Sequence, residues 1–155
     1  MMQEFGSVNN ILDFAISEEE AAAKFYTDLA MKMEREWMQK VFEDFAKEEE
    51  GHKEKLLTVK AGKIPLLTDK AVMDLKIGDY LVDVEPEVQG QDLDYQQALI
   101  LAMKKEKAAF KLYTDLAGQT EEKDYRNLFL ALAQEEAKHK LRFEIEYDEQ
   151  FLSEN

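Results

Sequence analysis

Two short segments of this chain place a glutamate three residues before a histidine, at Glu49–His52 and at Glu136–His139. These histidines are the only two among the 155 residues. Residues three apart lie on the same face of a helix, so each segment presents a carboxylate beside an imidazole. Both groups are common metal ligands. The first hypothesis is therefore that each segment contributes to a metal site.

The two segments belong to an internal repeat with an offset of 87 residues, the difference between positions 49 and 136. A Tyr-Thr-Asp-Leu-Ala sequence that begins at Tyr26 recurs from Tyr113 with the same offset. A register kept across several matched segments indicates two copies of one unit. The candidate site residues are Glu19, Tyr26, Glu49 and His52 in the first copy, and Glu106, Tyr113, Glu136 and His139 in the second.

The composition is that of a helical protein without a nucleic-acid partner. Only six Gly and two Pro occur, while Ala, Leu, Glu and Lys are abundant, and this balance favours helices. The formal net charge of −14 leaves no basic stripe to neutralise phosphates, which argues against nucleic-acid binding. A length of 155 residues fits a single domain, 1–155, with a real hydrophobic core.

No targeting or membrane segment is visible in the sequence. The N-terminus lacks the basic start and apolar stretch of a secretory signal, and no uncharged run is long enough to span a bilayer. The absence of cysteine rules out disulfides, thiolate zinc sites and Cys-ligated iron in this sequence. We therefore expect a cytoplasmic protein with no membrane partner.

Apolar residues with a period of 3.6 predict four long helices in two pairs. The first pair covers about residues 7–61, with a break near 34–36 and Gly62 after its last residue. The crossover that follows, about 57–92, contains most of the Gly and Pro and one short helix around 69–77. A small interaction lobe is the alternative interpretation of this crossover.

The second helix pair covers about residues 93–152. Its first helix is expected to end at Ala117, with Gly118 as the terminator, and Thr120 is expected to cap its second helix. The phenylalanines and methionines of the inner stripes, Phe110 included, are predicted to be core residues.

Each repeat is predicted to fold as a helical hairpin. Glu19 and Glu49 lie equally far from the first predicted turn. Glu106 and Glu136 lie equally far from the second. Residues equidistant from a hairpin turn reach the same height on antiparallel helices. Packing the hairpins about an approximate two-fold axis brings four Glu and two His to one level of an all-α four-helix bundle.

Four buried carboxylates at one level are costly unless cations accompany them. Two divalent ions supply four positive charges, and two imidazoles complete the ligands. This thiolate-free set suits iron, with manganese or zinc as possible substitutes. Tyrosines on an inner stripe are most often core residues, but Tyr26 and Tyr113 could each hydrogen-bond a ligand carboxylate, and we predict that role for them.

The sequence resembles the rubrerythrin group of ferritin-like di-iron proteins over nearly its whole length. The resemblance is densest at residues 17–26, 48–52, 105–113 and 135–139. It implies a ferritin-like bundle, reduction of hydrogen peroxide, oxidation of ferrous iron and defence against oxidative stress. The di-iron ligands that it implies are Glu19, Glu49, His52, Glu106, Glu136 and His139.

Two departures from the rubrerythrin pattern bear on function. Rubrerythrins place a further carboxylate three residues before the third-helix Glu, where this chain has Met103. The carboxylate exchange linked to their peroxide chemistry is therefore in doubt. Rubrerythrins also carry a C-terminal rubredoxin-like Cys₄ iron domain, whereas this sequence reaches Asn155 without a cysteine. We therefore expect a separate electron donor, such as a rubredoxin-like protein.

Three functions remain open from the sequence. The favoured one is a di-iron oxidoreductase, a homodimer, that acts on peroxide or O₂. The second is a ferroxidase or iron-storage protein that uses the same site. The third is a bundle whose metals only stabilise the fold.

Overall fold

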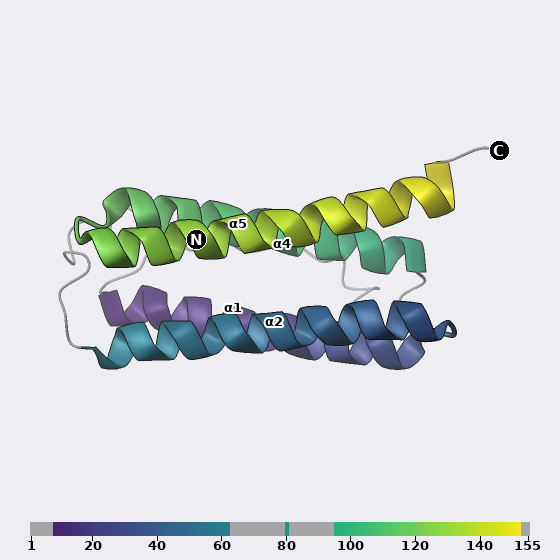
Figure 1. Ribbon diagram of the computed structural model, residues 1–155, viewed down its shortest axis with the longest axis horizontal. Helices are drawn as coiled ribbons and strands as arrows, with labels where there is room; N and C mark the ends of the chain where they lie inside the picture. The colour runs from purple at the N-terminus through teal and green to yellow at the C-terminus, as the bar shows by residue number, and fades with distance from the viewer. Residues whose placement is uncertain (1–7, 63–79, 81–94, 153–155) are drawn as a thin grey trace, which may run out of the picture. The chain divides into compact units, whose positions relative to one another are not determined.

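The computed structural model describes residues 8–62, 80 and 95–152, and every regular element in these ranges is helical (Figure 1). This finding confirms the predicted all-α class. The elements are α1 Val8–Lys32, α2 Glu36–Ala61, α4 Tyr95–Gln119, α5 Lys123–Tyr147 and a π-helical turn η2 at Asp148–Leu152. Both α4 and α1 begin and end at positions that differ by 87 residues, so the internal repeat extends to the helix boundaries.

α1 and α2 form the first helical hairpin and pack against each other along their length. The chain turns at residues 33–35, where the Gln39 side chain donates a 2.7 Å hydrogen bond to the Met33 carbonyl. Aromatic rings fill the adjoining core, with the Tyr26 ring centroid 6.4 Å from that of Phe42. The predicted break between the first two helices is confirmed.

α4 and α5 form the second hairpin, which has the same construction. The prediction that Thr120 caps its second helix is wrong. The Thr120 hydroxyl donates a 2.6 Å hydrogen bond to the Leu116 carbonyl and so closes the end of α4. The N-cap of α5 is Glu122, whose carboxylate accepts a 3.1 Å hydrogen bond from Tyr125 N. A carboxylate at this position also interacts favourably with the helix dipole.

The two glycines predicted at helix ends behave differently from the expectation. Gly62 follows α2 as predicted, but in a right-handed conformation (φ −68°, ψ −17°) rather than the left-handed one that favours glycine. Gly118 lies inside α4, so the predicted end at Ala117 is two residues too early. The helix continues through Gly118 because the Thr120 amide donates to the Ala117 carbonyl and holds the last turn.

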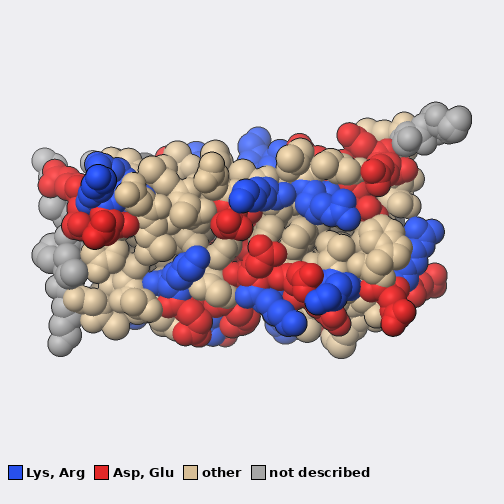
Figure 2. Space-filling model, in the orientation of Figure 1, with Lys and Arg blue, Asp and Glu red and all other residues tan. Residues whose placement is uncertain are grey.

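The distribution of surface charges agrees with the sequence analysis, whereas one residue predicted to lie in the core is exposed. On the face shown in Figure 2, lysine and arginine side chains are interspersed with carboxylates and form no continuous basic area. None of the described helices combines the length and hydropathy needed to cross a lipid bilayer. Phe110, predicted as core, is 41 % exposed.

The first residues of the predicted crossover, 57–61, belong to α2, and beyond Gly62 the structure describes only Tyr80 before α4. The short helix predicted around 69–77 lies outside the described residues. The Tyr80 side chain is buried, and its hydroxyl donates a 2.7 Å hydrogen bond to Asp115 Oδ2. Lys111 Nζ lies 2.8 Å from the same oxygen and 5.2 Å from the centroid of the Tyr80 ring. Tyr80 therefore fixes this point of the connection to α4.

Glu146, near the end of α5, is a buried carboxylate that the sequence pattern did not single out. The Tyr95 hydroxyl donates a 2.7 Å hydrogen bond to Glu146 Oε2. The other oxygen, Oε1, has no hydrogen-bond partner among the described residues. The repeat breaks at this position, because the residue 87 positions earlier is the buried, apolar Val59.

We expect Tyr95→Phe to lower the free energy of unfolding by about 1–3 kcal/mol, because the buried Glu146 carboxylate loses its hydroxyl donor. Urea unfolding followed by circular dichroism measures the change. Tyr147→Phe is the matched control, since the Tyr147 hydroxyl accepts a hydrogen bond from Gln96 at the surface and does not contact a buried carboxylate among the described residues. A loss of equal size in both variants would contradict the assignment.

Candidate metal centre

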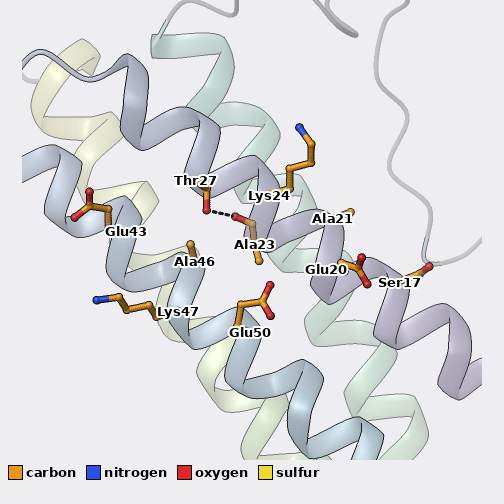
Figure 3. Close-up of a pocket in the computed structure, with 10 residues that line it drawn as sticks. All are labelled: Ser17, Glu20, Ala21, Ala23, Lys24, Thr27, Glu43, Ala46, Lys47 and Glu50. Carbon is orange, nitrogen blue, oxygen red and sulfur yellow. Dashed lines mark hydrogen bonds between the residues drawn. The ribbon is translucent and has the colours of Figure 1, made fainter.

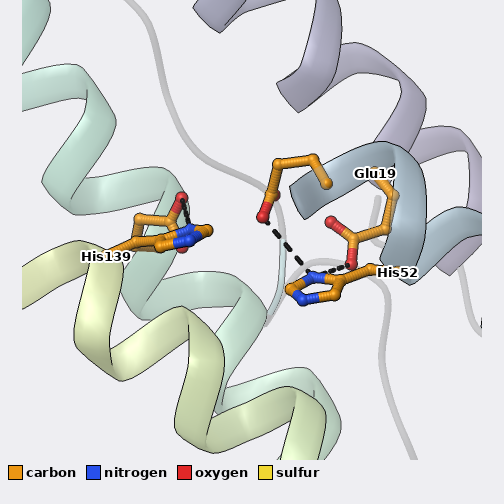
Figure 4. A network of polar contacts seen from close by, with 5 residues as sticks. Glu19, His52 and His139 are labelled. Atoms are coloured by element: carbon orange, nitrogen blue, oxygen red, sulfur yellow. Dashed lines mark hydrogen bonds and ion pairs between the residues drawn. The ribbon is translucent and has the colours of Figure 1, made fainter. Parts of the chain in front are cut away.

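The first hairpin brings Glu19 of α1 beside Glu49 and His52 of α2. Their ligand atoms lie within 4.8 Å of one another. His52 Nδ1 is 3.1 Å from Glu19 Oε2 and 3.4 Å from Glu49 Oε1, and Figure 4 shows the approach of Glu19 to the imidazole. Glu49 and His52 are one turn apart on the inner face of α2, and Glu19 meets them from the facing helix. We call these three residues the first half-site.

The second hairpin repeats this arrangement with Glu106 of α4 and with Glu136 and His139 of α5. The ligand atoms of these three residues also lie within 4.8 Å of one another. His139 Nδ1 is 3.6 Å from Glu106 Oε1. We call them the second half-site. The predicted pairing of an inward glutamate with Glu-x-x-His therefore holds within each hairpin.

The same imidazole atom, Nδ1, faces the glutamate of the other helix in both half-sites. Two donor atoms bound to one ion at about 2.1 Å and at a right angle lie about 3.0 Å apart. The observed N···O distances, from 3.1 to 3.6 Å, are close to this separation. Carboxylate oxygens and imidazoles without thiolates suit iron or manganese. The residues present therefore fit a divalent metal.

Burial strengthens the case for a cation. The six half-site residues are at most 3 % exposed. Each half-site holds two carboxylates and one imidazole, so even a protonated histidine leaves the group negative when both carboxylates are ionised. Uncompensated buried charge is strongly destabilising. A divalent ion in each half-site balances the charge of the two carboxylates.

The two tyrosines predicted near the ligands lie in the hairpin cores. Tyr26 and Tyr113 are both buried. The Tyr26 ring packs against Phe42 and Phe45, with centroid distances of 6.4 and 6.1 Å, which accounts for its burial through core packing. Hydrogen bonding of these tyrosines to ligand carboxylates stays a prediction.

A groove that the sequence gave no sign of runs along the outer side of the first hairpin (Figure 3). Its volume is about 970 Å³, and it is open to solvent. Ala23 and Ala46 line it together with Glu20 and Glu50, which directly follow Glu19 and Glu49. Glu20 and Glu50 therefore belong to the outer surface, as their angular position on the helices predicts.

Two solved structures share this fold over most of the chain. A Thermotoga maritima protein assigned as a ferritin-like diiron-carboxylate protein is 23 % identical, with a TM-score of 0.75 over 95 % of this chain and 98 % of its own. A hypothetical protein from Pyrococcus furiosus is 26 % identical, with a TM-score of 0.67 over 89 % and 86 % of the two chains. The search of curated proteins gives no match. The fold class is that of the ferritin-like four-helix bundles, made here of two repeated hairpins.

The family follows from the sequence match. The rubrerythrin family model matches residues 10–147, a range that includes all six half-site residues. The chain belongs to the rubrerythrin family. The resemblance noted in the sequence is therefore confirmed.

We expect the protein, purified without chelator, to bind two metal ions per chain, with iron preferred. Glu49→Ala should lose at least one ion, because it removes a carboxylate from the first half-site. Glu50→Ala is the matched control, since Glu50 lies about 100° further round α2 and lines the outer groove. Elemental analysis gives the metal content. Equal metal loss in both variants would rule out this ligand assignment.

Proposed function

We propose that this chain is a non-haem di-iron protein of the rubrerythrin type, whose centre reacts with hydrogen peroxide or O₂. The observation that carries the proposal is the pair of half-sites, each with two buried carboxylates beside a histidine Nδ1. Membership of the rubrerythrin family supports the same chemistry.

In this proposal the six half-site residues together hold two iron ions. Each histidine contributes Nδ1, and the four glutamates balance the charge of the ions. Bound iron supplies one electron per ion, so two ions can reduce one H₂O₂ with two protons to two waters. The protein holds the ligands in register and excludes bulk water from them. Tyr26 and Tyr113 would orient the ligand carboxylates.

Repeated turnover needs an electron donor, and the 155 residues contain no cysteine for a Cys-ligated iron centre. We propose a separate redox protein as the donor, such as a rubredoxin-like protein, and a role in cytoplasmic defence against oxidative stress. Iron oxidation or storage, and metals that only stabilise the fold, are the competing functions.

We expect peroxide to oxidise the di-ferrous protein rapidly and once per centre, because two bound ferrous ions would supply the two electrons and no donor is present to reduce them again. NADH alone should give negligible turnover. Stopped-flow absorbance follows the oxidation, and a peroxide assay follows the turnover. A di-ferrous protein that is inert to both peroxide and O₂ would leave only a structural role for the metals. A particle far larger than a dimer would instead favour iron storage.

Met103 is half-buried on α4, one turn before the ligand Glu106. We expect Met103→Glu to raise peroxidase activity when a suitable donor is present, because it restores the further carboxylate of the rubrerythrin pattern. Met103→Gln is the matched control, since it has a similar size and polarity but no charge. The idea fails if both variants change the turnover number equally.

A further inference from the structure

α5 carries an exposed apolar stripe on the side of the helix opposite its half-site residues. Leu130, Leu141 and Ile145 are 47, 56 and 40 % exposed, and the half-buried Ala137 lies among them. At 100° per residue, these four positions fall within an arc of about 80°, which also contains the exposed Gln134. We call these four residues the α5 face. Large apolar side chains gathered on one exposed face commonly mark an interaction site.

Phe110 of α4 adjoins the α5 face. The internal repeat relates Phe110 to Ala23, Leu130 to Glu43 and Ala137 to Glu50. The three earlier residues line one groove on the first hairpin. Because the two hairpins share helix boundaries and register, the three counterparts also share one side of the second hairpin. The exposure of Phe110, at 41 %, therefore enlarges the same apolar area.

The first hairpin serves as an internal control for the α5 face. The four positions on α2 that correspond to Leu130, Ala137, Leu141 and Ile145 are Glu43, Glu50, Glu54 and Thr58, all exposed and polar. The helix and its half-site therefore tolerate polar side chains at every one of these positions. The fold of the hairpin therefore does not require apolar residues at these positions of α5.

We propose that the α5 face is the contact surface between two copies of this chain, with the two α5 helices crossing antiparallel about a two-fold axis near Ala137. The two ends of the stripe are symmetric about its middle: Leu130 and Ile145 are equally far from the point between residues 137 and 138, and Leu141 lies opposite Gln134. A two-fold axis there places Leu130 against the partner's Ile145. The small Ala137 lets the helices approach at the crossing. A self-complementary patch of this kind is what an isologous dimer requires.

The charges at the ends of the α5 face favour the antiparallel direction. Arg126 lies before the stripe, and Asp148 and Glu149 lie after it, all three exposed. The same two-fold axis brings Arg126 beside the partner's Asp148 and Glu149. A parallel pairing would oppose like charges at both ends, in a chain that already carries a net charge of −14. The expected homodimer thereby acquires a definite surface, which does not depend on the redox chemistry of the metal centre.

Sedimentation velocity of the metal-loaded protein over a range of concentrations tests the proposal. We expect a species of twice the 18.0 kDa chain mass that dissociates on dilution. The double variant L130E/L141E introduces the residues that the first hairpin has at these positions, and it should be monomeric with unchanged helicity and metal content. Leu57→Glu is the control, because Leu57 is an exposed leucine of α2, at 38 %, outside the face.

A cysteine crosslink tests the geometry separately, because the chain has no cysteine of its own. Ala137→Cys should form a disulfide between two copies on mild oxidation, or a link through a short bis-maleimide. Glu50→Cys, at the corresponding position of α2, should form neither. A wild-type monomer at every concentration, a persistent L130E/L141E dimer, or open-ended larger species would each overturn the proposal. The first of these outcomes would assign the face to a different protein.

Discussion

The constraint on which this structure depends is the burial of two carboxylates and an imidazole inside each helical hairpin. Such a group is stable only where its charge is balanced, and the donor atoms are spaced as ligands of one ion are. Both hairpins meet this constraint in the same way, with a lone glutamate on one helix facing Glu-x-x-His on the other. The apolar residues around these positions keep water away, which is the condition that a reactive metal centre needs.

The internal repeat shows which features the site requires and which it leaves free. The offset of 87 residues is kept in the half-sites and in the boundaries of α1 and α4. It is lost on the outer surfaces, where one hairpin has a groove with charged walls and the other an apolar stripe. It is also lost inside, where Glu146 replaces Val59 and needs Tyr95 as a donor. The half-site residues thus keep the inner faces of the two hairpins alike, whereas the outer faces differ.

The sequence by itself determined the four helices, the repeat and the six candidate ligands. A 3.6-residue period identifies a buried face, and a glutamate within that face stands out because its burial is otherwise unfavourable. The family match confirms the rubrerythrin resemblance that these residues suggested. Helix ends were harder to predict, since Thr120 could either cap the next helix or close the previous one. Only the backbone path decides which carbonyl its hydroxyl reaches.

Only the tertiary structure decided which residues at the margins of each helix's inner face are buried and which are exposed. Phe110 belongs to an apolar stripe in the sequence, yet its side chain is partly exposed. Glu146 looks like a solvated residue in a charged segment, yet it is buried against Tyr95. The choice of Nδ1 as the imidazole atom that faces the opposite glutamate also depends on side-chain rotation. Periodicity gives the direction of a side chain around its own helix, but exposure depends on which neighbouring helix stands in that direction.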